Sequence, residues 1–318
     1  MVPQSREELA DDPTQARYLL GTEIEIVNPN LELGKIKHFL FDNDGTISTI
    51  REGWEEIMRP VMVEMIVGDH ANTIPQEKRA EIEQRVAQYV DETTGVQTIL
   101  QMEGLRKLVI EYGLVEKEKI LDAFGYKKEY LRRLMIPVRQ RIAKLERGEL
   151  DSSDLMIKGS LYFVKMLYDH GITLYLASGT DLADVINEAT KLTVAEYFSS
   201  NIYGALGTVK DYSKGQVIKR IITENNLRGP EFGCAGDGPV EIEETKKVKG
   251  IAICVASDEK RRWGLNPKKR RRGILKGADI VVPDFSQTQA LFELLTSDKR
   301  LIFSLTDHAY VLSDDFLL

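Results

Sequence analysis

The sequence predicts an α/β protein in which an open parallel sheet is interrupted by a long helical insertion. Two observations predict this fold class. Six short, nearly continuous apolar runs alternate with segments of helical spacing, a pattern that indicates strands buried on both faces of a parallel sheet. Residues 51–155, in contrast, contain no convincing strand and keep helical spacing throughout.

The apolar runs and the patterns between them place the individual elements. We expect strands at residues 36–41, 172–177, 201–205, 231–235, 251–256 and 278–282. Helices are expected in the segment GSLYFVKMLYDHG, where Gly171 is a stop signal, and at residues 181–192, 214–225 and 287–296. Residues 1–34 form an N-terminal extension, whose LLGTEIEIV run, followed by the turn signal NPN, can pair as a small hairpin.

Length and composition narrow the class of protein. A chain of 318 residues allows two domains, or one domain with a large insertion. With 42% hydrophobic and 29% charged residues, the chain is neither disordered nor collagen-like. Its apolar runs are too short to span a bilayer, and the start MVPQSREELADD lacks the apolar stretch of a secretory signal. We therefore expect a cytoplasmic protein without a membrane partner, whose two cysteines, Cys234 and Cys254, are buried free thiols.

The charge distribution contains one anomaly. The net charge of −7 argues against general nucleic-acid binding. However, residues 260–272, KRRWGLNPKKRRR, hold eight of the 43 Lys and Arg residues, with Pro267 at a possible helix start. This basic segment is interpreted either as a solvated loop and helix face or as a site for a polyanion or nucleic acid.

The first strand ends in a pair of carboxylates. In FLFDNDGTIST, the strand is followed by Asp42 and Asp44, and Gly45 and Thr46 then turn the chain. Ligands of open α/β sheets bind beyond the carboxyl ends of the strands. At such a position one carboxylate can attack a substrate while the other handles protons.

Other strand ends supply complementary groups. The second strand ends at Ser178 and Gly179, which offer a hydroxyl and backbone N–H groups to phosphate oxygens. Lys214 begins a predicted helix, where its ammonium and the helix dipole both favour an anion. The segment GDGPVE places Asp237 and Glu241 at the same edge. Carboxylates clustered without histidine suit a hard cation such as Mg²⁺.

Together these motifs resemble the haloacid dehalogenase superfamily, in particular its magnesium-dependent, phosphoglycolate-phosphatase-like members with a helical cap. The resemblance rests on the run DNDGT at residues 42–46, on Ser178, on Lys214 and on GDGPVE at residues 236–241. The run GADIVVPD further resembles the sixth strand of such phosphatases, so that the match covers residues 35–298. It implies a Rossmann-like core of residues 35–50 and 156–318, with a helical cap at 51–155.

The resemblance also implies roles for the site residues. Asp42 would be the nucleophile that forms an aspartyl-phosphate, and Asp44 would protonate the leaving group and later activate water. The Asp42 carboxylate, the Asp44 main-chain carbonyl and Asp237 would hold Mg²⁺. Glu241 would orient metal-bound water or Lys214.

A second set of implied roles concerns the phosphate. Ser178 and Lys214, together with Thr46 and Gly179, would bind the oxygens of the transferring phosphoryl group. Lys210 lies four residues before Lys214 and is an alternative phosphate lysine, although the helix pattern at Lys214 favours the latter.

The expected substrate is a small phosphorylated metabolite. Dehalogenases and phosphonatases of the superfamily lack the second aspartate, so Asp44 favours hydrolysis of phosphate monoesters. The nearest enzyme alternative is a phosphosugar mutase on the same core. The mutases that resemble this chain carry a histidine soon after the first motif, whereas STIREGW contains none.

The helical insertion is expected to close over the site and set its specificity. Hinges are expected near residues 46–53 and 152–158, and closure would exclude water from the reaction. The candidate substrate contacts, for each of which ordinary packing is the alternative, are Arg51, Trp54, Lys158 and the loop at residues 93–95, which contains Thr94.

Overall fold

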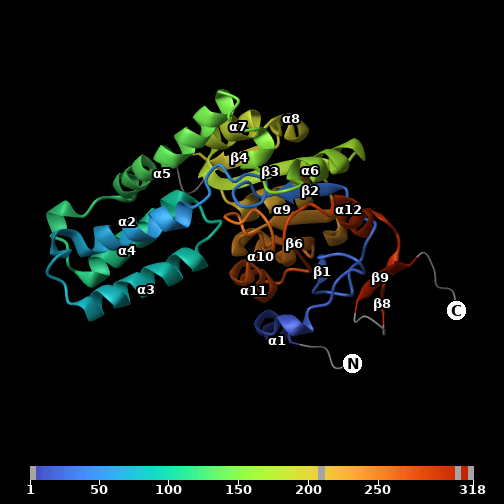
Figure 1. The fold of residues 1–318 in the computed structure, drawn as a ribbon, viewed down its shortest axis with the longest axis horizontal. Coiled ribbons are helices and arrows are strands. Elements are labelled where there is room, and N and C mark those ends of the chain that lie inside the picture. Colours follow the sequence, from blue (N-terminus) through green and yellow to red (C-terminus); the bar gives the residue numbers. More distant parts are fainter. Residues whose placement is uncertain (1–4, 207–211, 305–308, 314–318) are drawn as a thin grey trace.

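The computed structural model describes residues 5–206, 212–304 and 309–313 (Figure 1). Its centre is a seven-stranded sheet with the order β1-β7-β6-β5-β2-β3-β4, parallel except for the edge strand β1. All six predicted strands are present. The strands are β1 (Glu25–Ile26), β2 (His38–Phe41), β3 (Thr173–Asp181), β4 (Ile202–Ala205), β5 (Phe232–Gly236), β6 (Ile251–Val255) and β7 (Ile280–Val282).

Helices cover both faces of this sheet. Successive side chains of β2 point to opposite faces, so Phe39 and Phe41 join one buried cluster and Leu40 joins another. The face of Phe39 and Phe41 packs against α6 (Ser160–Asp169), α7 (Leu182–Lys191), α8 (Ala195–Phe198) and α12 (Thr288–Thr296). The opposite face is covered by α9 (Lys214–Glu224), α10 (Pro239–Lys247) and α11 (Pro267–Leu275). The predicted α/β class is therefore confirmed, and both cysteines are buried and free.

The two ends of the chain add to one edge of the sheet. Residues 17–26 form a small antiparallel hairpin, in which Leu19 N donates to Ile24 O (2.8 Å) and Ile26 N to Arg17 O (2.8 Å). The returning strand of this hairpin is β1, which pairs with β7. The remaining elements here are α1 (Arg6–Asp11), which packs on α11, and the antiparallel strands β8 (Arg300–Phe303) and β9 (Tyr310–Ser313).

A group of four helices lies to one side of the sheet (Figure 1). They are α2 (Trp54–Val67), α3 (Gln76–Glu92), α4 (Thr98–Tyr112) and α5 (Ala123–Glu146). Apolar residues at helical spacing, such as Ile82, Val86 and Val90 of α3, are fully buried between these helices. The two connections to the sheet run side by side, because Thr49 N donates to Leu155 O (2.8 Å) and Ile157 N to Ile47 O (2.9 Å).

Short 3₁₀ turns complete the described elements. They are η1 (Pro13–Gln15), η2 (Gly68–His70), η3 (Lys117–Lys119), η4 (Ser152–Leu155) and η5 (Gly229–Glu231). None of the helices in the described part of the chain combines the length and the apolar character needed to cross a membrane.

Candidate active site

The carboxyl ends of β2, β3 and β5 meet the helical group at a small cavity of about 60 Å³. Parallel strands bring their ends to one edge, so residues distant in sequence become neighbours there. The sheet side of the cavity is lined by Asp42, Asp44, Ser178, Gly179, Thr180, Lys214 and Asp237. The helical side contributes Arg51, Trp54, Met58, Thr94, Gly95, Val96, Thr98, Gln101, Tyr130 and Leu134.

Lys214 is the central cation of this edge. It is the first residue of α9, whose N-cap Ser213 accepts a hydrogen bond from Gln216 N. The Lys214 ammonium lies 2.7 Å from Asp42 Oδ1 and 2.9 Å from Glu241 Oε2, and all three side chains are buried. Burial raises the pKa of Asp42 well above its usual value; Lys214 opposes this shift, and Glu241 and Asp237 reinforce it.

The same contacts keep the lysine charged. Although burial favours the neutral amine, Asp42 and Glu241 raise the pKa of Lys214 well above its usual value. A charged, buried ammonium at the sheet edge can bind an anion. The alternative phosphate lysine, Lys210, lies outside the described residues.

Asp44 is held by hydroxyl groups at the end of β3. Its Oδ2 accepts hydrogen bonds from Ser178 Oγ and Thr180 Oγ1, both at 3.2 Å. The turn that carries Asp44 is tight, since the backbone N–H groups of Ile47 and Ser48 both donate to Asn43 O at 2.9 Å. Asp44 is thus oriented but remains at the cavity, where it can exchange a proton.

A glycine is required in this turn. Gly45 has a φ of 74°, and a Cβ atom there would lie 2.5 Å from Asp237 Oδ2. The close approach of the Gly45 backbone to Asp237 therefore brings the carboxylates of β2 and β5 together.

Asp237 and Glu241 are positioned by the start of α10. Pro239 is the first residue of this helix, and Glu241 Oε1 accepts a hydrogen bond from Gly238 N (2.7 Å) as in a capping box. Carboxylate oxygens of Asp42, Asp237 and Glu241 all lie within 4.8 Å of one another. The predicted cluster is therefore assembled in space.

The donor set and the charge at this edge fit a divalent cation. The three clustered groups offer only oxygen atoms, which hard cations such as Mg²⁺ prefer. The ion pairs at this edge leave a negative excess for a divalent ion to neutralise, because Asp42 and Glu241 share the one ammonium of Lys214, and Asp237 and Glu259 share that of Lys269.

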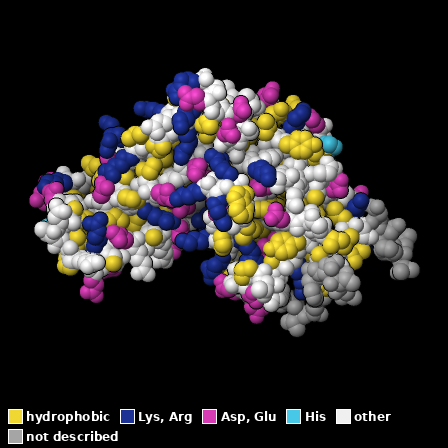
Figure 2. All heavy atoms as spheres, viewed as in Figure 1, with side chains coloured by type: hydrophobic (Ala, Val, Ile, Leu, Met, Phe, Trp, Pro, Cys, Tyr) yellow, Lys and Arg dark blue, Asp and Glu magenta, His cyan; other side chains and the backbone are white. Residues whose placement is uncertain are grey.

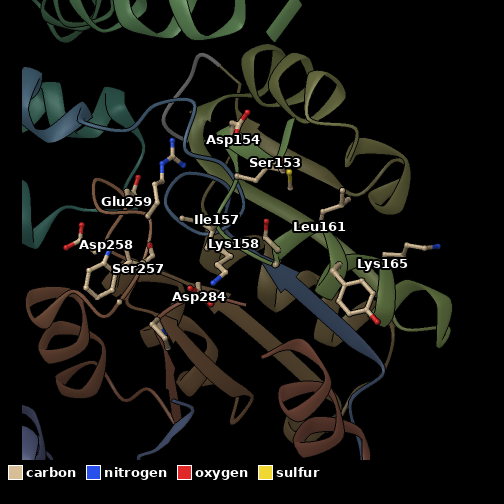
Figure 3. A pocket seen from close by; sticks show the side chains of 18 residues that line it. Ser153, Asp154, Ile157, Lys158, Leu161, Lys165, Ser257, Asp258, Glu259 and Asp284 are labelled. Carbon is tan, nitrogen blue, oxygen red and sulfur yellow. The ribbon is translucent and has the colours of Figure 1, made fainter. Parts of the chain in front are cut away.

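Three sequence-predicted residues do not line this cavity: Glu241, which contacts Lys214 of the lining, and Thr46 and Lys158, which lie away from it. Thr46, predicted to bind phosphate, is fully buried outside the cavity lining, and among the described residues its hydroxyl has no hydrogen-bond partner. Lys158, predicted to contact substrate, lines a separate pocket of about 580 Å³ (Figure 3). Figure 3 shows the Lys158 side chain near Asp284, with Ser257 and Glu259 on the neighbouring wall.

The other predicted contacts on the helical side do line the cavity. Arg51 is buried, and its guanidinium forms ion pairs with Glu188 Oε1 (2.7 Å) and Asp184 Oδ2 (2.9 Å) of α7. Trp54 and Thr94 also lie on the cavity wall, and Thr94 Oγ1 accepts a hydrogen bond from Arg272 Nη1 (3.2 Å).

The loop at residues 93–95, which the sequence proposed as a substrate contact, lies close against the sheet side of the site. A Cβ atom on Gly95 would lie 2.9 Å from Glu241 Oε2, and one on Gly179 would lie 2.7 Å from Val96 O. The loop that contains Gly95 and Val96 is therefore inserted against the sheet edge. The sequence placed this loop at the site but gave no sign of how closely its backbone approaches Gly179 and Glu241.

The basic segment at residues 260–272 is largely paired within the chain. Most of the segment is exposed, as the interpretation of a solvated loop and helix face expects, but two of its residues, Lys269 and Arg270, are buried and depart from it. Carboxylate partners exist for Lys260 (Glu56), Arg261 (Asp258), Arg262 (Glu52), Lys269 (Asp237 and Glu259), Arg270 (Glu25) and Arg271 (Asp11). Figure 2 shows Lys and Arg side chains gathered along the hollow between the helical group and the sheet.

Comparisons with known proteins agree with this fold. The sequence matches no family model and no curated protein. Among solved structures, β-phosphoglucomutase from Clostridium difficile is 14% identical, with a TM-score of 0.51 over 82% of this chain and 97% of that chain. A protein described as a predicted phosphoglycolate phosphatase from Haemophilus somnus is 13% identical, with a TM-score of 0.51 over 81% and 98%.

A third similar structure is a haloacid dehalogenase-like protein of unknown function from Agrobacterium tumefaciens. It is 14% identical, with a TM-score of 0.50 over 82% of this chain and all of that chain. The fold that the sequence motifs imply is therefore confirmed: this chain has the fold of the haloacid dehalogenase-like proteins.

Proposed function

We propose that this chain is a magnesium-dependent phosphatase that hydrolyses a small phosphate monoester through an aspartyl-phosphate on Asp42. One observation carries the proposal. Asp42 directly follows the inner strand β2 in a buried position, contacts the Lys214 ammonium at 2.7 Å, and shares a cavity with Asp44. A nucleophile, a phosphate-binding cation and a proton donor are the groups that this chemistry requires.

The first half of the reaction is attack by an Asp42 carboxylate oxygen on phosphorus, with release of the alcohol. Lys214, buried beside Asp42, would bind the transferring phosphoryl oxygens, and Ser178 and Gly179 border the same space. When bound by Asp42, the Asp44 main-chain carbonyl and Asp237, Mg²⁺ would supply positive charge that keeps Asp42 ionised against the effect of its burial.

Asp44 would move the protons. Ser178 and Thr180 hold its carboxyl group toward the cavity, where it would protonate the leaving oxygen. In the second half it would take a proton from the water that hydrolyses the aspartyl-phosphate. Glu241, which bonds both Gly238 N and Lys214, would act by positioning the lysine.

The helical group would act as a cap on the core. We assign residues 1–34 to an N-terminal extension, 35–50 and 156–318 to the core, and 51–155 to the cap. Two contacts support a closed arrangement: Lys127 pairs with Asp181 (2.5 Å), and Gln97 Nε2 donates to Tyr212 O. A cavity of about 60 Å³ under the closed cap favours a small phosphorylated metabolite, with Arg51, Trp54 and Thr94 as candidate specificity residues.

Phosphate release should identify the activity. Incubation with a panel of phosphorylated metabolites and Mg²⁺ is expected to release inorganic phosphate from at least one compound, and a chelator should stop the release. Isomerisation of a sugar phosphate without net phosphate release would instead identify the mutase alternative. Absence of both reactions across sugar, nucleotide and carboxylic-acid phosphates would contradict the proposal.

A further inference from the structure

Lys269 of the basic segment lies at the proposed metal site. The side chain of Asn266 caps α11 by accepting hydrogen bonds from Lys268 N and Lys269 N, and Pro267 occupies the first helical position. This start turns Lys269 toward the sheet and leaves Lys268 exposed. The Lys269 ammonium lies 2.8 Å from Asp237 Oδ2 and 2.6 Å from Glu259 Oε1.

This ion-paired group contacts the turn that follows the proposed nucleophile, Asp42, and carries Asp44. A Cβ atom on Gly45 would lie 2.5 Å from Asp237 Oδ2 and 3.1 Å from Glu259 Oε1. Ser257 Oγ donates to Gly45 O (3.1 Å) and lies 3.4 Å from Lys269 Nζ. The Lys269 ammonium therefore holds a carboxylate oxygen of the very cluster that would take up a divalent ion.

The buried Lys269 ammonium is paired with two carboxylates, those of Asp237 and Glu259. The two carboxylates share one ammonium, so Lys269 can give up one partner and keep the other. Arg272 meanwhile donates to the Asp237 main-chain oxygen (3.0 Å) and holds the loop in place.

We propose that Lys269 competes with the divalent cation for Asp237, and that Glu259 retains the ammonium when the metal binds. The proposal rests on the magnesium site of the proposed function and adds a control on its affinity. A cation a few ångströms from the metal position repels the metal, and this repulsion is strong where water is largely excluded. The basic segment would therefore set the concentration of Mg²⁺ at which the enzyme is loaded.

Metal titrations of matched lysine variants test this competition. Mg²⁺ binding would be measured by calorimetry, and independently by the rise in melting temperature, for wild type, K269M and K268M. K269M is expected to bind Mg²⁺ about tenfold or more tightly than wild type, since it loses the nearby charge but keeps an unbranched side chain. K268M removes the same charge from the exposed neighbour and is expected to change the affinity by less than about twofold.

A second variant acts without altering Lys269. E259Q leaves Asp237 as the only anionic partner of the ammonium among the described contacts and should weaken Mg²⁺ binding. Equal or weaker binding by folded K269M would overturn the role of Lys269 while leaving the metal site intact. If neither wild type nor K269M binds Mg²⁺, or if D237N binds it as well as wild type does, the metal site of the proposed function fails as well.

Discussion

Replacement of Asp42 by asparagine is expected to abolish phosphate-ester hydrolysis, with a loss of about four orders of magnitude or more in kcat. The asparagine amide has almost the same shape as the carboxyl group but cannot attack phosphorus. The fold should survive, because burial already favours the neutral form of Asp42 and Lys214 keeps its contact with Glu241. Release of phosphate from an aryl phosphate measures the activity, and thermal unfolding measures the fold.

The matched control for this variant is Asp298→Asn. Asp298 is largely exposed, and its contact with Lys35 is long, at 3.6 Å. The same chemical change is therefore expected to leave turnover unaltered there. Unchanged turnover in Asp42→Asn would remove the nucleophile from the proposal.

The second large effect is expected from Lys214→Met, which should lose both activity and stability. Two buried carboxylates, Asp42 and Glu241, would lose their common counter-charge. Breaking a buried ion pair on one side costs about 3–5 kcal/mol of unfolding free energy. Urea unfolding measures this loss, and Lys219→Met, an exposed position on the same helix, is the control.

The loss in Lys214→Met should depend on pH. The pKa of Asp42 is raised in the folded protein, so its contribution favours folding below its unfolded pKa and is lost as pH rises through the folded value. Ionising the buried Asp42 carboxyl costs more folding free energy without Lys214, because the lysine no longer offsets the buried negative charge. The deficit relative to wild type should therefore be smaller in mildly acidic buffer than at neutral pH. A pH-independent deficit, or one shared by Lys219→Met, would contradict the buried charge network.

The sheet and the grouping of the candidate site residues at its edge were predictable because the signals are local. Continuous apolar runs marked every parallel strand of the sheet, and the shared direction of these strands brought Asp42, Ser178, Lys214 and Asp237 to one edge. The edge strand β1 is only two residues long and pairs with β7, far along the chain. Such a short element carries almost no periodic signal, so only its hairpin was anticipated.

The remaining features of the site depend on long-range packing. The composition of residues 260–272 revealed a basic segment. Which of its side chains face the sheet depends on how helix α11 is oriented about its axis: Lys269 faces Asp237, and Lys268 faces solvent. Lys158 follows Ile157, which belongs to the connection that leads from the helical group back to the sheet. The Lys158 side chain lines a different pocket from that of Asp42. Thr46 fits the family pattern, yet a tight turn buries it away from the cavity.

Capture of the covalent intermediate tests the central claim most directly. Turnover would be quenched in acid, and the digested protein analysed by mass spectrometry for a phosphoryl group. The account predicts a phosphorylated peptide whose modified residue is Asp42, and no such peptide from Asp42→Asn. A phosphoryl group on another residue, or none on Asp42 while substrate is being consumed under conditions that preserve acyl phosphates, would contradict the account.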